Sequence, residues 1–242
     1  MIRFRSLLIA LFSIGMICGG AYSQEVADAK WNVQVEMQIV ALPEDLAVPL
    51  VPDFLDEKKI EAAYAKLQML IASGKAKLVG WPILTTMSGQ RAVIESIEEM
   101  RFPSEFKQPG VEVAKPPAGK EAEKAEPKPA ASTFDATPAA FETRNAGVTL
   151  EIEPVVSADG HSISVNLVPQ HVRLHTYKKS TLELPRDGTK LVVEQPEFHT
   201  SKVTTSLTLQ NGERKFLGAY KVADPAGHME FFILKVGAKR VP

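Results

Sequence analysis

Two histidines, His171 and His175 in "HVRLH", are the residues whose type and spacing come nearest to a metal site. Histidines four residues apart lie on one face of a helix, where they can bind a zinc ion together. Here the intervening Val172 and Leu174 are typical of a strand, and no third ligand is near in the sequence. We therefore expect a pair of surface or edge histidines and no metal site.

Three acids, Glu95, Glu98 and Glu99, could supply a paired general acid and base. Along a strand they are more simply a solvated face. The sequence has no Gly-x-Ser-x-Gly elbow and no phosphate-binding glycine loop ending in Lys-Ser or Lys-Thr. Phe231 and Phe232 indicate core or interface packing. We predict no catalytic residue and no cofactor, and hence a protein that is not an enzyme.

A secretory signal peptide is predicted at residues 1–23. The basic start "MIRFRS" precedes an apolar run from Leu7 to Ile17, and small residues then lead to a cut between Ser23 and Gln24. That order of basic, apolar and small segments is typical of export signals. A membrane anchor is the alternative, but the run is short for the ~20 residues that span a bilayer.

Cys18, the single cysteine, offers a lipid-modified chain as a further alternative. Met16 and Ile17 before it are poor small-residue positions and disfavour lipidation. Cleavage would remove this cysteine and leave an exported chain without disulfides. The loss of Arg3 and Arg5 takes the formal charge from −1 to about −3, which gives no basic excess for nucleic acid.

A linker is predicted between two structured halves. Residues 114–131 read "AKPPAGKEAEKAEPKPAA", in which nothing larger than alanine is apolar. Such a segment buries too little surface to offset its ordering entropy, so we expect a disordered spacer rich in Ala, Lys, Pro and Glu. Its charges alternate in sign and nearly cancel. The linker is drawn over residues 107–140.

The first half, residues 24–106, is predicted as a β-α-β-β unit. "WNVQVEMQIVAL" alternates apolar and polar residues, which indicates a strand with one buried face. "DEKKIEAAYAKLQMLIASGK" places apolar residues at helical spacing, with Gly74 as the C-cap. A strand over Lys77 to Thr86, a turn at Ser88-Gly89 and a strand from Arg91 towards Phe102 complete a hairpin beneath one covering helix.

The second half, residues 141–242, is predicted as an antiparallel sheet or small sandwich. One hairpin turns at Asp159-Gly160 and another, between "KVTTSLTL" and "RKFLGAYKV", turns at Asn211-Gly212. His171 to Glu197 is less regular and includes a long excursion. "MEFFILKVG" forms an apolar final strand. The fold class is therefore α+β, mostly antiparallel β.

These elements, in this order, resemble the core domain of the bacterial secretin family, whose members form outer-membrane rings in type II and III secretion systems and type IV pili. "VQVEMQIVAL" resembles its opening strand, and "KLVGWPILTTMSGQRAVIESIEEMRFP" its Pro-x-x-x-x-x-x-x-Gln-x-Ala-x-Ile hairpin. "GVTLEIEPVVSADG", "KVTTSLTLQNGERKFLGAYK" and "MEFFILKVGAKRV" resemble later strands. The matching positions are Glu36, Pro82, Gln90, Ala92, Ile94, Pro103, Gly147, Leu150, Pro154, Asp159, Gly160, Thr205, Gly212, Leu217 and Gly218.

Several departures shape what the resemblance implies. Ala41 stands where a second acid is expected, Glu98 or Glu99 replaces a glycine, and Ala219 replaces another. The family's gate motif, due between Tyr220 and Met229, is reduced to "KVADPAGH", and the repeated N-terminal domains do not precede the first core strand. The resemblance is thus to a short form without gate or repeats.

The leading hypothesis is a non-enzymatic, secretin-like envelope protein, a structural or accessory component of a secretion or pilus system. Its partners would be other proteins, or further copies joined through sheet edges. We expect an exported protein in the periplasm or at the outer membrane, with no nucleic-acid partner. A soluble periplasmic binding module that keeps the fold is the main alternative. An exported hydrolase would need acids or histidines converging from both halves.

Overall fold

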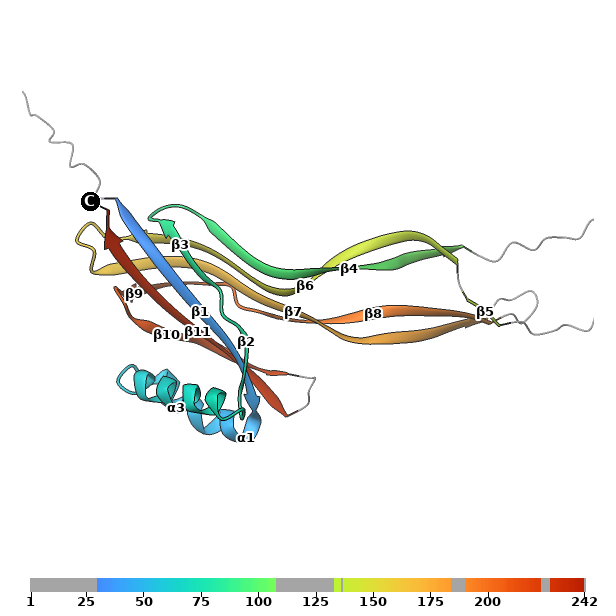
Figure 1. The fold of residues 1–242 in the computed structure, drawn as a ribbon, viewed down its shortest axis with the longest axis horizontal. Coiled ribbons are helices and arrows are strands. Elements are labelled where there is room, and N and C mark those ends of the chain that lie inside the picture. The colour runs from blue at the N-terminus through green and yellow to red at the C-terminus, as the bar shows by residue number, and fades with distance from the viewer. Residues whose placement is uncertain (1–29, 108–132, 136, 184–189, 223–226, 242) are drawn as a thin grey trace, which may run out of the picture.

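Two β-sheets and a layer of short helices form the molecule (Figure 1). The computed structural model describes residues 30–107, 133–135, 137–183, 190–222 and 227–241. Within these ranges, no helix has both the length and the apolar character needed to cross a membrane. The predicted cleavage site at Ser23 and Gln24 lies outside the described residues.

The first sheet is built around β1 (Trp31–Pro43), which pairs along its whole length with β11 (His228–Arg240). β10 (Arg214–Val222) flanks β11, and β2 (Lys77–Gly80) and β3 (Ile83–Met87) follow one another along the other side of β1. All these pairings are antiparallel. The first and last strands of the described chain therefore form the centre of this sheet.

The second sheet consists mainly of four long antiparallel strands. They are β4 (Ala92–Lys107), β6 (Thr137–Val156), β7 (Ser162–Glu183) and β8 (Lys190–Lys202), in that spatial order. Two short strands complete the sheet: β9 (Thr205–Gln210) pairs with β7, and β5 (Thr133–Asp135) pairs in parallel with β8. The predicted α+β fold, mostly antiparallel, is confirmed.

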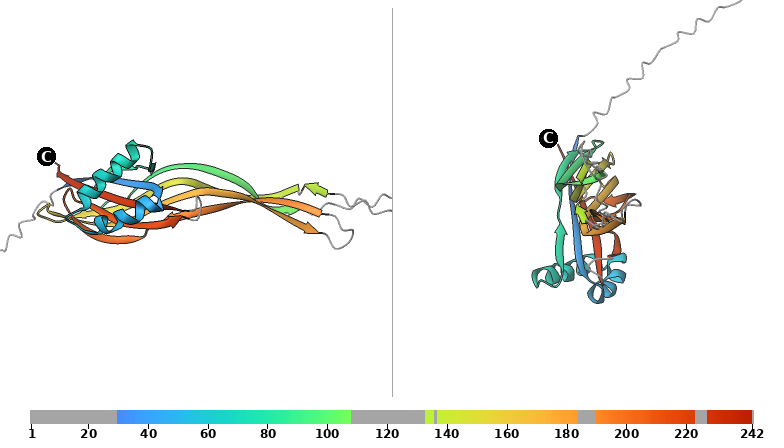
Figure 2. Two further views of the ribbon diagram at one scale, coloured as in Figure 1. Left: turned by 90° about the horizontal axis from the view of Figure 1, so that it is seen from below. Right: turned by 90° about the vertical axis from the view of Figure 1, so that its right-hand side faces the viewer.

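The sheets pack face to face over only part of their length. β6 and β7 pair from Val156↔Ile163 to Gly147↔Val172 and then separate. Beyond that point β4–β6 and β7–β8 continue as two-stranded arms, which Figure 2 shows extending from the helix-covered body. The body is held by an apolar core contributed by both sheets: Val33, Val35, Met37, Ile39, Leu150, Ile152, Ile163, Val165, Leu167, Leu209, Phe232, Leu234 and Val236.

The helices cover the other face of the first sheet. They are α1 (Glu44–Ala47), the 3-10 turn η1 (Val48–Leu50), α2 (Val51–Leu55) and α3 (Ile60–Ala72). α3 is the helix expected from the sequence, whereas the two short helices before it have too few residues to show a period. A second apolar core lies beneath them, formed by Val40, Leu42, Ala47, Phe54, Ile60, Ala63, Leu67, Phe231 and Ile233.

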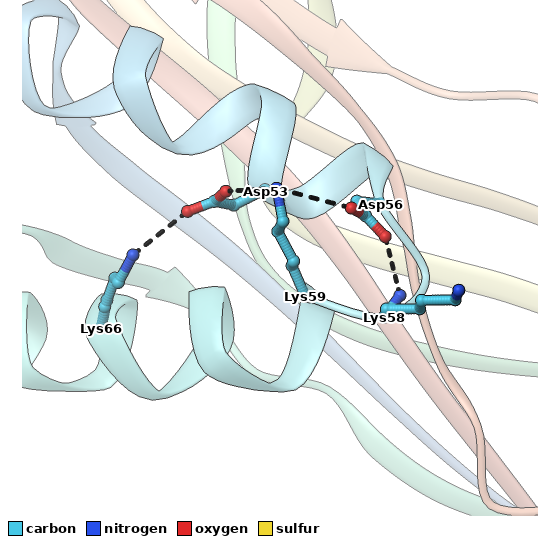
Figure 3. A network of polar contacts seen from close by, with 5 residues as sticks. All are labelled: Asp53, Asp56, Lys58, Lys59 and Lys66. Carbon is cyan, nitrogen blue, oxygen red and sulfur yellow. Dashed lines mark hydrogen bonds and ion pairs between the residues drawn. The ribbon is translucent and has the colours of Figure 1, made fainter.

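Ion pairs tie α2 to α3 on the exposed side of this layer (Figure 3). Asp53 receives Lys66 Nζ at 3.1 Å and Lys59 Nζ at 3.9 Å. Asp56 accepts a hydrogen bond from the backbone N–H of Lys58 at 2.9 Å. Because these side chains are largely in water, each pair contributes at most about 1 kcal/mol. The apolar residues beneath the helices therefore hold this layer in place.

The expected hairpin between Lys77 and Phe102 is wrong. β3 pairs with β1 in the first sheet, whereas β4 pairs with β6 in the second. The Ser88-Gly89 turn instead passes from one sheet to the other: Ser88 N–H donates to Trp31 O, and Gly89 N–H donates to Pro154 O. The chain reverses there as expected, but β3 and β4 pair with β1 and β6 and not with each other.

The second expected hairpin, at Asn211-Gly212, is wrong for the same reason. β9 belongs to the second sheet and β10 to the first. The Asn211 side chain holds this crossing: its Nδ2 donates to Gly160 O and Ala238 O, and its Oδ1 accepts from Ala238 N–H at 2.8 Å. By contrast, the hairpin at Asp159-Gly160 forms as expected between β6 and β7.

Three further expectations need correction. The described part of the segment from His171 to Glu197 is more regular than expected, since β7 and β8 pair from Gln170↔Lys202 to Glu183↔Lys190 with one register shift; residues 184–189 lie outside the described residues. The linker is drawn too wide, because residues 137–140 belong to β6; its centre, 108–132, lies outside the described residues. The opening strand is buried on both faces near its end, where Gln38 is 2% exposed beneath the helices.

Candidate functional site

A buried ionic cluster joins the two sheets where the apolar core ends. We call it the waist cluster and define it by His171 and Arg173 on β7, Ser201 on β8 and Glu230 on β11. The Oε1 atom of Glu230 lies 2.6 Å from Arg173 Nη1 and 3.2 Å from His171 Nδ1. The Glu230 side chain is only 2% exposed, so this carboxylate is effectively removed from water.

Strand periodicity places these residues in the cluster. The alternation that buries Ile163, Val165 and Leu167 continues along β7 to His171 and Arg173. On β11, Glu230 lies on the same face as the core residue Phe232. On both strands the inward-facing residues therefore change from apolar to charged at the same end of the core. The charged side chains of β7 and β11 meet there, between the two sheets.

The cluster keeps Glu230 ionised. Burial raises the pKa of its carboxyl, but contacts with His171 and Ser201 and the charge of Arg173 outweigh burial and lower that pKa below its ordinary value. Nearby, burial and the positive charge of Arg173 lower the pKa of His199. A neutral His199 beside a charged Arg173–Glu230 pair is thus the stable state of the waist near neutral pH.

Several buried polar atoms of the cluster have hydrogen-bonding capacity to spare. Glu230 Oε2 and Arg173 Nε and Nη2 are buried and have no hydrogen-bond partner among the described residues. Buried polar groups normally have such a partner, from the protein or from ordered water. The waist therefore has room for polar contacts beyond those within the chain.

A groove runs past the waist along the outer edge of β2, and we call it the edge groove. It consists of two adjoining hollows, of about 720 and 440 Å³, that share Val79 and His171. The larger is lined by the loop before β2, the end of β1 and the waist cluster. The smaller lies between Gly80–Pro82 and the facing residues of β4 and β6.

The expected surface histidines occupy unequal positions. His171 is part of the waist cluster, whereas His175 is exposed at an irregularity where the β7–β8 register shifts between Leu174 and Thr176. In the part of the chain that the structure describes, no three His, Cys, Asp or Glu residues are arranged to hold a metal ion. The helical spacing of the two histidines is thus irrelevant in a strand.

The other candidate residues from the sequence, three acids and two phenylalanines, lie at positions that fit a structural role. Glu95, Glu98 and Glu99 are exposed on β4. Phe231 packs edge-on against Phe54 and Phe216 in the helix-side core, with centroids 5.5 and 5.2 Å apart, and Phe232 lies in the core between the sheets. Within the described ranges, no hydrogen bond or ion pair joins Glu95, Glu98 or Glu99 to a second ionisable group.

The positions matched to the secretin pattern build turns and close contacts. At Gly147, where φ is +132°, a Cβ atom would lie 2.1 Å from Ser96 O, and at Gly160 it would lie 2.3 Å from the Trp31 ring. The rest occupy strands, turns or the short connections between strands of both sheets: Glu36, Pro82, Gln90, Ala92, Pro103, Pro154, Asp159, Gly212, Leu217 and Gly218. They remain predicted family positions with a structural role.

Sequence reasoning missed Arg173, Glu230 and the edge groove. Glu230 is the one acid within the apolar run "MEFFILKV", which signals a buried charge in need of a partner. The partner could not be named, because Arg173 lies on a strand of the other sheet.

Comparison with known families decides the assignment. A model of the family described as "Secretin: Bacterial type II and III secretion system protein" matches residues 69–221. The chain belongs to the secretin family. The matched range begins within α3 and ends in β10, so it includes all four long strands of the second sheet.

Solved structures of secretins are similar at low identity. InvG of the Salmonella SPI-1 type III secretion injectisome is 12% identical, with a TM-score of 0.40, over 88% of this chain and 64% of InvG. GspD of ETEC, solved with the pilotin AspS, is 9% identical, with a TM-score of 0.42, over 89% and 50%. The type IV competence pilus secretin PilQ of V. cholerae is 11% identical, with a TM-score of 0.39, over 90% and 62%.

This secretin-family chain thus spans about half to two thirds of the length of those structures. A search of curated proteins found no match to it.

Proposed function

We propose that this secretin-family protein is a non-enzymatic structural component of a bacterial secretion or pilus machine, and that it assembles with further copies through the edges of its second sheet. It would act after export, in the periplasm or at the outer membrane. The observation that supports assembly most directly is the pairing of the long strands.

Both outer strands of the second sheet have an open edge. Within the described residues, β4 pairs only with β6, and β8 has no partner on its outer side beyond the short contact of Lys190–Val192 with β5. An open edge exposes a row of unpaired N–H and C=O groups, which is a template for another strand. One copy offering β4 and the next offering β8 would extend the sheet from subunit to subunit.

Light scattering after size-exclusion chromatography tests this assembly on protein expressed without residues 1–23. We expect an oligomer whose population rises with concentration. Glu98→Pro and Glu99→Pro form a matched pair, because successive strand residues direct their N–H groups to opposite sides. In one variant the proline removes an N–H group that donates to β6. In the other, the edge-blocking variant, it removes an N–H group that points to the open edge. The edge-blocking variant should keep its melting temperature and lose assembly; a wild-type monomer at high concentration contradicts the proposal.

The edge groove supports a second candidate, a periplasmic binding module that uses the secretin fold without forming a ring. Osmotic shock separates the two functions. A wall- or membrane-bound assembly stays with the envelope fraction, whereas a binding module is released as soluble protein. Release of all the protein as a monomer would favour the binding module.

A further inference from the structure

The outer edge of β2 is open along the edge groove. In the described chain β2 pairs only with β1, through Ile39↔Gly80, Val40↔Leu78 and Ala41↔Lys77. Backbone groups of β2 that do not face β1 therefore point into the groove without a strand partner. Such an edge is the usual place where an extended peptide adds to a sheet.

One end of the groove is rich in positive charge. Lys75, Lys77 and Arg173 line the larger hollow, where Glu230 is the only acid. Glu230 is already engaged by Arg173 and His171. Lys75 and Lys77 are exposed, and neither makes an ion pair with a described residue, so their charges are available to a ligand.

The groove also has apolar lining, and its other end is not basic. Ala41, Leu46, Val79 and Val222 line the larger hollow together with the charged residues. The smaller hollow, past Gly80, carries Glu95 and no lysine or arginine. The groove thus changes along its length: Lys75 and Lys77 lie at the end near the loop before β2, Val79 and His171 lie where the two hollows meet, and Glu95 lies at the end near Trp81 and Pro82.

We propose that the edge groove binds an extended segment of a partner protein, which adds as a strand to β2. The segment carries carboxylates at the end that lies beside Lys75 and Lys77, and small or β-branched apolar residues over Val79. Backbone hydrogen bonds to β2 supply strand pairing, and the two lysines select acidic sequences. This partner site uses the edge of β2 and not the edges of β4 and β8 that the proposed assembly uses, although Ile94–Ser96 of β4 line its smaller hollow.

The test uses a labelled eight-residue peptide that has valine at alternate positions and glutamates at one end. Fluorescence anisotropy measures its binding to the purified protein. The same peptide with lysines for glutamates tests charge selection, and a version N-methylated at alternate amides tests strand addition. We expect saturable binding of the acidic peptide only. Equal binding of the lysine peptide or of the N-methylated peptide overturns the proposal.

Two double variants of equal charge change localise the binding. Lys75→Glu with Lys77→Glu should weaken binding by about tenfold or more, since it reverses the charge of the rim. Lys30→Glu with Lys239→Glu changes exposed lysines at the far end of β1 and β11 and should leave binding unchanged. Equal loss in both variants would show attraction by net charge alone and overturn the site.

Two controls separate this inference from others. The Lys75→Glu, Lys77→Glu variant should have the oligomeric state of the wild type, because neither residue lies on β4 or β8. Vesicles containing phosphatidylglycerol replace the peptide in a parallel assay. Binding to vesicles that depends on Lys75 and Lys77, without binding to the acidic peptide, overturns the peptide proposal in favour of a lipid phosphate.

Discussion

Nη1 of Arg173 lies 2.6 Å from Oε1 of Glu230, and this contact joins a strand of the second sheet to the last strand of the first. It lies where the arms leave the body, at the end of the apolar core. A buried ion pair rarely adds net stability over a well-packed apolar pair, because both ions lose their water. Removing either partner alone is nevertheless costly, because it leaves the other charge buried without a counter-charge.

Glu230→Gln should therefore be strongly destabilising. It leaves Arg173 partly buried without its counter-charge, and we expect a loss of about 2–4 kcal/mol in the free energy of unfolding. Urea unfolding followed by circular dichroism measures this loss. Adding Arg173→Gln should recover part of it, and Glu95→Gln, an exposed acid, should cost under about 0.5 kcal/mol. No recovery in the double variant would mean that the pair does not couple.

Acidification should loosen the waist before the rest of the molecule. The pKa of His199 lies below its ordinary value of 6.5, so the unfolded chain binds this proton more readily than the folded one. Stability is then complete above pH 6.5 and falls as the pH drops towards the lowered pKa. Melting temperatures of the wild type and His199→Gln between pH 7.5 and 5 should converge on acidification; parallel curves contradict this.

Gly160 and Gly212 provide a test of close approach. Both have positive φ, +73° and +87°, but only at Gly160 would a Cβ atom collide, 2.3 Å from the Trp31 ring. Gly212→Ala should cost about 1 kcal/mol through backbone strain. Gly160→Ala adds a clash between the sheets and should cost about 2–4 kcal/mol. Chemical denaturation compares them, and equal losses would show that Trp31 moves aside freely.

Phe231→Ala should be among the most damaging substitutions in the helix-side core. The side chain is fully buried and contacts Phe54 and Phe216, so its removal should cost about 3–5 kcal/mol. Phe141, 48% exposed on β6 beneath Arg101, is the matched control, and its loss should cost under about 1 kcal/mol. A similar effect at both sites would contradict the assignment of the core.

Local sequence patterns predicted where the strands lie better than they predicted which strands pair with each other. Alternation identified β1, an apolar run identified β11, and Asp159-Gly160 correctly marked a hairpin because the strands on either side pair with each other. Ser88-Gly89 carries an equally clear turn signal. Its strands separate into different sheets because β3 packs along β1, and no local residue encodes that choice.

The site was less predictable than the fold for the same reason. His171 was noticed for its spacing to His175, yet its partner is Glu230, 59 residues further along the chain. The edge groove depends on β2 being short and unpaired on one side, which is a property of the assembled sheet. Its charge could be seen only after Lys75 and Arg173 were brought to one surface.

The pairing of β1 with β11 also sets the order in which the protein can fold. Trp31↔Arg240 and Pro43↔His228 mark the ends of a ladder whose two strands are almost the whole sequence apart. Until β11 has been synthesised, β1 lacks the strand with which it pairs along its whole length. Contacts of such long range are formed late and slowly. A chain that is still being delivered from its N-terminus therefore cannot complete its first sheet until its final strand arrives.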